Sequence, residues 1–235
     1  MKQFNRQSLL IGGENTQKLI NSSVIIFGLG GVGGFTVESL SRAGLGTITL
    51  VDFDTVDITN LNRQIIATHS SIGEEKTKLF KTRILDINPN TIVNVHNLRV
   101  TPDNVKTLFD NIKYDYIVDA IDTISAKLAL IKISKDRDIP IISSMGFGNK
   151  LDPTTIKIAD ISKTSVCPLA RTIRKELKKR RINRVKTVFS TEIATKPNNP
   201  NNSREKAANV GSVSFVPSVA GLIIAGEVIK DLIKS

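Results

Sequence analysis

The sequence has few of the side chains that bind transition metals or form covalent cross-links. Among its 235 residues there is one cysteine, Cys167, and there are two histidines, His69 and His96. A single cysteine cannot form an internal disulfide. The same set cannot supply the cysteine and histidine ligands of a structural zinc site. Two isolated histidines also give no support to acid–base catalysis by histidine.

Long apolar segments are missing as well. The first residues, MKQFNRQSLL, lack the apolar core of a signal peptide. The longest apolar tract near the C-terminus, VPSVAGLIIAGEVI, is interrupted by Pro217, Gly221 and Gly226 and is shorter than the roughly 20 residues that cross a membrane. We therefore expect a cytoplasmic protein with no membrane span, in which this tract forms a buried closing helix from about Pro217 to Lys234.

Positive charge is concentrated in one part of the chain. The net charge is +11, and residues 163–186 hold ten Lys or Arg side chains against one Glu, which gives this segment +9. Such a tract is expected to bind a polyanion, a nucleic acid before a membrane. A solvated helix face is the alternative. The remaining composition, with 40% hydrophobic residues, is ordinary for a globular protein.

Strand-like and helix-like segments alternate from Val24 to about Phe147. The predicted strands cover residues 24–28, 47–52, 91–97, 116–122 and 140–146, and apolar side chains recur at helical spacing in 74–87 and 125–137. This order is typical of an α/β fold, a Rossmann-like and mostly parallel sheet wrapped by helices.

The remaining residues are predicted to extend the same domain. We expect a strand within 150–163, a basic helix over 167–181, a mobile polar loop over 195–209 and the closing helix. The whole chain, 1–235, is thus predicted to be one domain. Its Rossmann-like nucleotide-binding core is residues 1–147, and residues 148–235 form a smaller strand and helix extension.

The segment SVIIFGLGGVGG, residues 23–34, joins an apolar run to a cluster of glycines. Gly28, Gly30 and Gly33 form the pattern Gly-x-Gly-x-x-Gly, in which the backbone can approach a pyrophosphate at a helix N-terminus. Asp52 ends the second predicted strand, near the position at which a carboxylate binds a ribose. A nucleotide is expected, but NAD and ATP fit these residues equally well.

The following residues favour a triphosphate. Asn60 and Arg63 lie in DITNLNRQ, and Lys76 stands at the start of a predicted helix. Each could by itself simply face solvent. Cleavage of ATP between its α and β phosphates needs cations that stabilise the developing charge, whereas a nicotinamide site needs an apolar face.

A metal ligand is predicted at the end of the fourth strand. The segment DAIDT contains Asp119 and Asp122, and a carboxylate there could hold a Mg²⁺ ion that bridges phosphate oxygens. We favour Asp122 because it lies closer to the carboxyl end of the strand. ATP and Mg²⁺ are therefore the expected cofactors.

Five of these segments resemble the ubiquitin-activating-enzyme-like adenylyltransferases: NRQ near the N-terminus, GLGGVGG, DFDTVDITNLNRQ, GEEKTK and DAID. The resemblance spans most of the chain. It implies a homodimer in which Arg6 reaches the ATP site of the partner subunit. The implied catalytic residues are Arg6, Arg63, Lys76 and Asp122, with Asp122 on the metal. The implied nucleotide ligands are Gly28, Gly30, Gly31, Gly33, Asp52, Asp54, Asn60, Arg63 and Lys76.

Within that family, residues 101–131, 148–180 and 188–192 look most like tRNA threonylcarbamoyladenosine dehydratases. This likeness implies that ATP adenylylates the threonyl carboxylate of a modified adenosine in tRNA, after which a ring closes and AMP leaves. The basic tract would then bind the RNA backbone. The candidate RNA-binding side chains are Arg171, Arg174, Lys175, Lys178, Lys179 and Arg181.

Other functions remain open at this point. One is activation of the C-terminal glycine of a ubiquitin-like sulfur carrier, with a sulfur-relay protein as partner. Enzymes of that kind commonly carry paired Cys-x-x-Cys motifs, and this chain lacks them. A second is a non-catalytic tRNA-binding adapter, and an NAD-dependent dehydrogenase is a third. Cys167 precedes a predicted helix, where a thiolate would be favoured. A small buried or capping side chain is the simpler interpretation.

Overall fold

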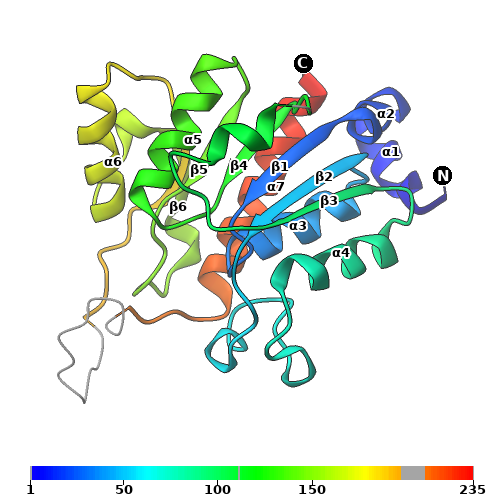
Figure 1. The fold of residues 1–235 in the computed structure, drawn as a ribbon, viewed down its shortest axis with the longest axis horizontal. Helices are drawn as coiled ribbons and strands as arrows, with labels where there is room; N and C mark the ends of the chain where they lie inside the picture. Colours follow the sequence, from blue (N-terminus) through cyan, green and yellow to red (C-terminus); the bar gives the residue numbers. More distant parts are fainter. Residues whose placement is uncertain (1, 111, 197–209, 235) are drawn as a thin grey trace.

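One seven-stranded β-sheet forms the centre of the computed structural model, which describes residues 2–110, 112–196 and 210–234 (Figure 1). The strands are β1 Ser23–Phe27, β2 Thr47–Asp52, β3 Ile92–Asn97, β4 Tyr116–Asp119, β5 Ile141–Ser144, β6 Ile156–Asp160 and β7 Lys186–Ser190. Their order is β3-β2-β1-β4-β5-β7-β6. All neighbours pair in parallel except β6 and β7. The α/β, mostly parallel fold expected from the sequence is confirmed.

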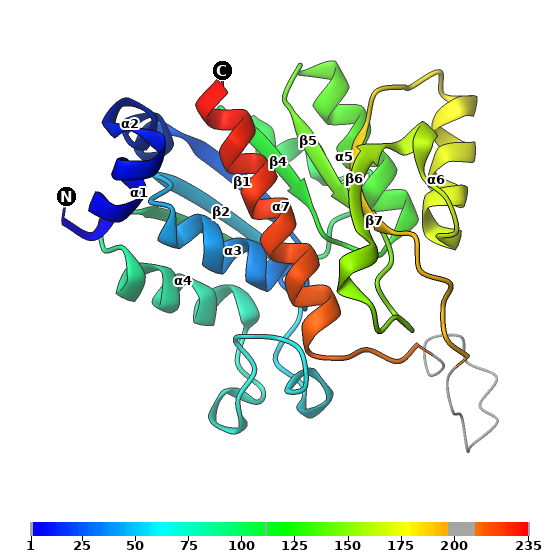
Figure 2. The ribbon, with the colours of Figure 1, turned by 180° about the vertical axis from the view of Figure 1, so that it is seen from behind.

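Helices cover both faces of the sheet, and β1 shows why. Alternate side chains of a strand point to opposite faces. Val24 and Ile26 pack with the helices of one face, whereas Ile25 and Phe27 pack with those of the other. The first face carries α2 (Gly13–Asn21), α3 (Gly33–Arg42), α4 (Lys76–Ile87) and α7 (Phe215–Lys234) (Figure 2). The second carries the short helix η4 (Val105–Phe109), α5 (Ile124–Asp136) and α6 (Pro168–Lys179) (Figure 1).

The helix bounds place most of the predicted segments. The helices are α1 Asn5–Ile11, α2 Gly13–Asn21, α3 Gly33–Arg42, α4 Lys76–Ile87, η4 Val105–Phe109, α5 Ile124–Asp136, α6 Pro168–Lys179 and α7 Phe215–Lys234. Helices were expected within residues 74–87, 125–137 and 167–181, and α4, α5 and α6 form there, with α5 beginning one residue earlier at Ile124. The longest helix, α7, includes charged residues, and the described part of the chain holds no helix apolar and long enough to cross a bilayer.

The N-terminal helices α1 and α2 were not predicted, and β5 ends at Ser144 rather than at residue 146. Two further differences concern β4 and β7. The fourth strand ends at Asp119 rather than at residue 122, because the chain after Ala120 leaves the sheet in an irregular segment that leads into the helix beginning at Ile124. The strand β7 was not predicted, since its five residues follow a strongly basic segment and show little alternation. It inserts between β5 and β6 and joins the C-terminal extension to the central sheet. Most of the loop predicted over 195–209 lies outside the described residues.

The connections create a crevice at the carboxyl ends of β1 and β4. From β1 the chain builds β2 and β3 on one side, and then crosses to β4 on the other side of β1. Helices leaving such neighbouring strands lie on opposite faces, so the strand ends separate and leave room for a ligand. The backbone holds this edge together, since Gly28 N–H donates to Val51 O at 2.9 Å and Ala120 N–H donates to Phe27 O at 2.8 Å.

Candidate active site

The turn between β1 and α3 needs glycine at two positions for reasons of its own geometry. Gly28 has φ +86°, and a Cβ there would lie 2.7 Å from the carbonyl oxygen of Ala120. A Cβ on Gly33 would lie 1.8 Å from the carbonyl oxygen of Gly28. Both contacts are closer than packed atoms allow, so the fold itself demands these two glycines.

Gly30 has no such requirement. Its φ is not positive, and a Cβ there would have only the Nε2 atom of Gln64 as a neighbour, at 3.8 Å. Gly31 is tighter, because a Cβ would lie 3.2 Å from Cβ of Pro217. The space above Gly30 belongs to a cavity, so the bare backbone at this position serves the cavity rather than the fold.

This cavity has a volume of about 490 Å³ and lies over the carboxyl ends of β1, β2 and β4. It brings together nearly all the predicted nucleotide and catalytic residues. Its lining includes Gly28, Gly30, Gly31, Asp52, Asp54, Asn60, Arg63, Lys76 and Asp122. Gly33 is not in the lining, because its place in the turn is structural.

Lys76 is the cation placed most deeply in the site. It is the first residue of α4 and is only 3% exposed, while its Nζ atom lies 3.0 Å from Oδ2 of Asp54. The Lys76 N–H also donates to the Asp54 carbonyl oxygen at 3.1 Å. An ammonium group held in this way can bind a phosphate, provided that Asp54, whose side chain is 47% exposed, shares or releases it.

Asp52 organises the glycine turn. Its Oδ2 atom accepts the Leu29 N–H at 2.6 Å, and its Oδ1 atom accepts the Asp54 N–H at 2.8 Å. Both oxygens keep a further lone pair that a ribose hydroxyl could use. The carboxylate therefore fixes the end of β2 against the glycine turn, in addition to the ribose contact expected from the sequence.

The segment after β2 positions Asn60 and Arg63. Asp57 caps a short helix of residues 58–60, and the Asp57 N–H donates to Oδ1 of Asn60 at 3.2 Å. Hydrogen bonds from the Thr59 hydroxyl and N–H lower the pKa of the exposed Asp57 carboxyl. Arg63 donates from Nη1 to the Thr59 carbonyl oxygen at 2.8 Å, which holds the guanidinium at the rim of the cavity.

Gln64 is a site residue that the sequence analysis missed. It lines the cavity and is only 7% exposed, and its Oε1 atom has no hydrogen-bond partner within the described residues. A buried amide oxygen without a partner costs free energy, which a bound donor would recover. The signal available in the sequence was its position directly after Arg63 in NRQ.

The structure separates the two carboxylates considered as metal ligands. Asp119 is fully buried, with its Oδ2 atom 2.9 Å from Nζ of Lys127 and 2.6 Å from the Ser143 hydroxyl. Asp122 lies three residues beyond β4, exposed and in the cavity lining. Mg²⁺ is usually held by one or two carboxylates together with substrate phosphates and water, so Asp122 fits an ion brought in by a triphosphate. No cluster of three or more potential metal-ligating side chains occurs among the described residues.

Two predicted groups lie away from this cavity. Arg6 is exposed on α1, beside the start of β1 and at the opposite end of that strand from the glycine turn (Figure 1). The basic side chains of α6 lie at the other edge of the molecule. Among them Arg174 is already engaged, since its Nη1 atom donates to the Thr164 carbonyl oxygen at 2.9 Å.

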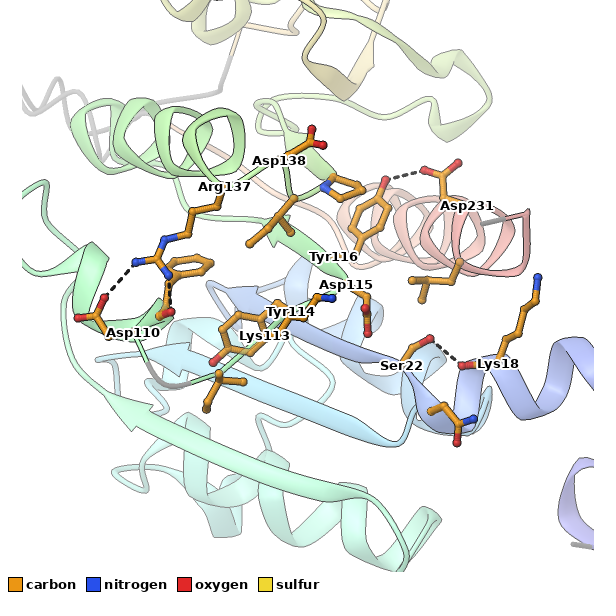
Figure 3. Close-up of a pocket in the computed structure, with 16 residues that line it drawn as sticks. Lys18, Ser22, Asp110, Lys113, Tyr114, Asp115, Tyr116, Arg137, Asp138 and Asp231 are labelled. Carbon is orange, nitrogen blue, oxygen red and sulfur yellow. Dashed lines mark hydrogen bonds and ion pairs between the residues drawn. The ribbon is translucent and has the colours of Figure 1, made fainter.

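A larger cavity of about 850 Å³ lies at the amino ends of β1, β4 and β5 (Figure 3). Several of its polar side chains are paired with one another: Arg137 lies 3.0 Å from Asp110, and the Tyr116 hydroxyl donates to Asp231 at 2.7 Å. Burial, together with this hydrogen bond, raises the pKa of Tyr116. The cavity is remote from the glycine turn and is not the candidate active site.

Comparisons with known proteins show the family to which the chain belongs. The sequence profile of the ThiF family matches residues 4–235. A tRNA threonylcarbamoyladenosine dehydratase of Bacillus subtilis is 45% identical over 244 aligned positions, which cover 100% of this chain and 96% of that protein. Crystal structures of the Escherichia coli tRNA N6-threonylcarbamoyladenosine dehydratase with ATP and with AMP superpose with TM-scores of 0.90 and 0.91, at 33% identity, over 99% of this chain and 94% of each of those chains. The resemblance seen in the motifs is thus confirmed, and on the strength of a match that runs almost from end to end, this chain belongs to the ThiF family.

Proposed function

We propose that this protein dehydrates threonylcarbamoyladenosine in tRNA at the expense of ATP. The threonyl carboxylate attacks the α phosphorus of ATP, and pyrophosphate leaves. A nitrogen or oxygen atom of the carbamoyl arm then attacks the activated carbonyl carbon and closes a ring. AMP departs with one carboxylate oxygen, and a nitrogen of the carbamoyl group loses a proton whichever atom closes the ring, so the nucleoside loses one water overall.

The side chains in the cavity suit the first of these steps. A carboxylate is already a nucleophile at neutral pH and needs positioning more than deprotonation. The main task is to stabilise negative charge on the α phosphate and on pyrophosphate. Lys76 and Arg63 are predicted cations of the cavity lining that suit this task, and Arg99 lines the same cavity. Asp122 would hold a Mg²⁺ ion, which would supply further positive charge to the phosphates.

One observation carries the proposal: the bare backbone of Gly30 and the buried Lys76 line one cavity of about 490 Å³, in a chain that aligns from end to end with a tRNA threonylcarbamoyladenosine dehydratase. Because the relative from Bacillus subtilis is a tRNA threonylcarbamoyladenosine dehydratase, tRNA that carries threonylcarbamoyladenosine is the first substrate to test. The exposed cations of α6 provide a surface for its phosphates.

The test is mass spectrometry of tRNA that carries threonylcarbamoyladenosine, incubated with the protein, ATP and Mg²⁺. We expect the modified nucleoside to lose the mass of one water, with one AMP formed for each turnover. Lys76→Ala should abolish the loss. A wild-type protein that exchanges pyrophosphate into ATP yet leaves the nucleoside intact would point to another acceptor, and one that does neither would fit a non-catalytic adapter.

A further inference from the structure

A second cavity adjoins the first. It has a volume of about 300 Å³ and shares six lining residues with the nucleotide cavity: Gly30, Gly31, Arg63, Ala120, Ile121 and Asp122. Its remaining walls come from Val32, from the end of β5 and the residues after it, from the start of α6 and from Val210, Ser212 and Pro217. Any group bound there would lie against the same glycines and the same arginine as the phosphates of a nucleotide.

The walls of the second cavity are mostly apolar. Met145, Phe147, Leu169 and Val210 contribute apolar side chains, and glycine backbone at positions 146 and 148 widens the space. Arg63 is the one cationic side chain among the described residues that line this cavity, and it also lines the nucleotide cavity. This arrangement suits a ligand with a flat or apolar body and one anionic end, with the anion directed at the phosphates.

Hydrogen bonds fasten the outer wall to the nucleotide cavity. Asn62 accepts from Nη1 of Arg63 at 3.0 Å and donates from Nδ2 to the Ser212 carbonyl oxygen at 2.9 Å. Asn149 and Gly211 hold each other by two further hydrogen bonds, of 2.6 and 2.8 Å. These hydrogen bonds fix the position of residues 210–212 relative to Arg63. The second cavity therefore belongs to the same site as the nucleotide cavity.

The second cavity also meets the basic helix. Leu169 belongs to its wall and is the second residue of α6. Arg171, Lys175 and Lys178 follow on one face of that helix, exposed and without a side-chain partner in the described part of the chain. Leu169 stands roughly 120–180° around the helix from these cations. A polyanion bound to them would therefore reach the cavity around the first turn of α6.

We propose that the second cavity is the acceptor subsite, which takes the carboxylate-bearing arm of a modified nucleoside in an RNA loop docked on α6. The apolar walls receive the base and the aliphatic part of the arm, and Arg63 draws the carboxylate towards the α phosphate of ATP. This assignment rests on the proposed function. It favours a nucleoside over a protein C-terminus because α6, which carries the exposed cations, begins in the wall of this cavity.

The test introduces a side chain into the second cavity at Gly146, a position where the surrounding structure has room for one. A Cβ on Gly146 would make ordinary contacts, at 3.9 Å with Sγ of Cys167 and at 4.0 Å with Cβ of Leu169, and the position has no positive φ. Gly146→Val therefore adds bulk beside Leu169 with little strain on the backbone. Gly146→Ala is the milder version should the valine variant fail to fold. Gly226→Ala on α7 is the matched control, because a Cβ there has no neighbour within 4 Å.

We expect Gly146→Val to lower kcat/KM for the modified tRNA about tenfold or more, and Gly146→Ala to lower it about threefold. The Kd of ATP, measured by calorimetry without tRNA, should stay within about twofold of wild type in both variants. Gly226→Ala should match wild type in both measurements.

Three results would overturn the assignment. Unchanged kcat/KM for tRNA in Gly146→Val, with active wild type, would place the acceptor elsewhere. A Kd of ATP that rises as much as kcat/KM falls would make this space part of the nucleotide site. Release of pyrophosphate with a peptide ending in Gly-Gly, lost in Gly146→Val, would show a subsite for a protein terminus. Wild type that never removes water from the tRNA would instead refute the proposed function.

Discussion

Gly28 and Gly30 are two residues apart in one turn, but they are glycine for different reasons. At Gly28 the positive φ and the Ala120 carbonyl oxygen exclude a side chain, so the fold sets the residue. At Gly30 nothing in the fold excludes one, and a side chain would enter the nucleotide cavity instead. Substitution of these two residues should therefore separate folding from binding.

We predict that Gly30→Ala folds normally and binds ATP about tenfold or more weakly, because its methyl group occupies space that the phosphates need. The melting temperature and the Kd of ATP by calorimetry check this. Gly13→Ala is the control, since a Cβ at position 13 has no neighbour within 4 Å. Gly28→Ala should instead lower the free energy of unfolding by about 1–3 kcal/mol or more. Equal ATP affinity in Gly30→Ala and wild type would show that the phosphates of ATP do not bind against Gly30.

The second prediction at this scale concerns Asp122, the exposed carboxylate in the turn after β4. Asp122→Asn keeps the size of the side chain and removes the charge that would hold Mg²⁺. We expect kcat to fall at least about 100-fold, with a smaller change in the Kd of ATP. Assays over a range of Mg²⁺ concentrations measure this. Asp119→Asn is not an equivalent control, since Asp119 is buried against Lys127. Full turnover of Asp122→Asn at saturating Mg²⁺ would exclude the metal role.

At the scale of elements, the structure changes the set of side chains that α6 can offer to RNA. All six predicted cations lie on or beside this helix, but Arg174 is half-buried and donates to Thr164, and Lys179 pairs with Glu176. Hydrogen bonds from Arg180 and Lys179 lower the pKa of Glu176 to about 2. Glu176 thus remains charged at neutral pH and partly neutralises that end of the helix. Among the residues that the structure describes, Arg171, Lys175 and Lys178 form an exposed face of α6 without side-chain partners, and Arg181 is likewise exposed just beyond the helix.

We predict that charge reversal of Arg171, Lys175 and Lys178 to Glu weakens tRNA binding and flattens its dependence on salt. Each lost phosphate contact should lower the slope of log K against log salt by about 0.7 to 0.9. Binding assays at several salt concentrations give the slope, and the Kd of ATP should not change. Arg174→Gln is the comparison, because it should loosen the packing of α6 on Thr164 and lower the melting temperature. An unaltered slope in the triple variant would place the RNA on another surface.

At the scale of the whole molecule, Arg6 cannot be assigned to the nucleotide cavity of its own chain. It lies on α1 at the far end of β1, and the same helix exposes Leu9 and Leu10, which are 89% and 87% accessible. Apolar side chains so exposed favour a contact with another molecule. A two-fold dimer that covered α1 would exchange Arg6 between the two subunits reciprocally.

We predict that mixing the inactive variants Arg6→Ala and Lys76→Ala restores activity. In a mixed dimer, one site combines an intact Lys76 with an intact Arg6 from the partner subunit, and the other site has neither. Random exchange makes about half of the dimers mixed, so about a quarter of wild-type activity should return if the sites act independently. Subunit exchange is verified by differently tagged chains. A mixture that exchanges subunits and stays inactive contradicts the shared site.

The local order of residues determined the elements of the core and their chemistry. Apolar runs such as VIIFG predicted the inner strands, helical spacing predicted α4 and α5, and a glycine cluster before a helix predicted the phosphate turn, because these patterns depend on neighbouring residues only. Lys76, Arg63 and Asp52 could be named for the same reason, since each lies at a recognisable distance from a strand or helix end. The tertiary structure brings them into one cavity, as the motifs required.

Other features depend on contacts between distant segments, which local patterns do not encode. The pairing of β7 between β5 and β6 adds a short strand that has little signal of its own. The burial of Asp119 on Lys127, in contrast to the exposure of Asp122, follows from the turn after β4 and the packing of α5. Packing likewise determines the hydrogen bond from Arg174 to Thr164 and leaves the Gln64 amide oxygen without a partner among the described residues. The sequence alone determined which chemical groups are present and on which elements they stand, whereas folding decided which of them are free to meet a ligand, because that depends on what each side chain contacts across the molecule.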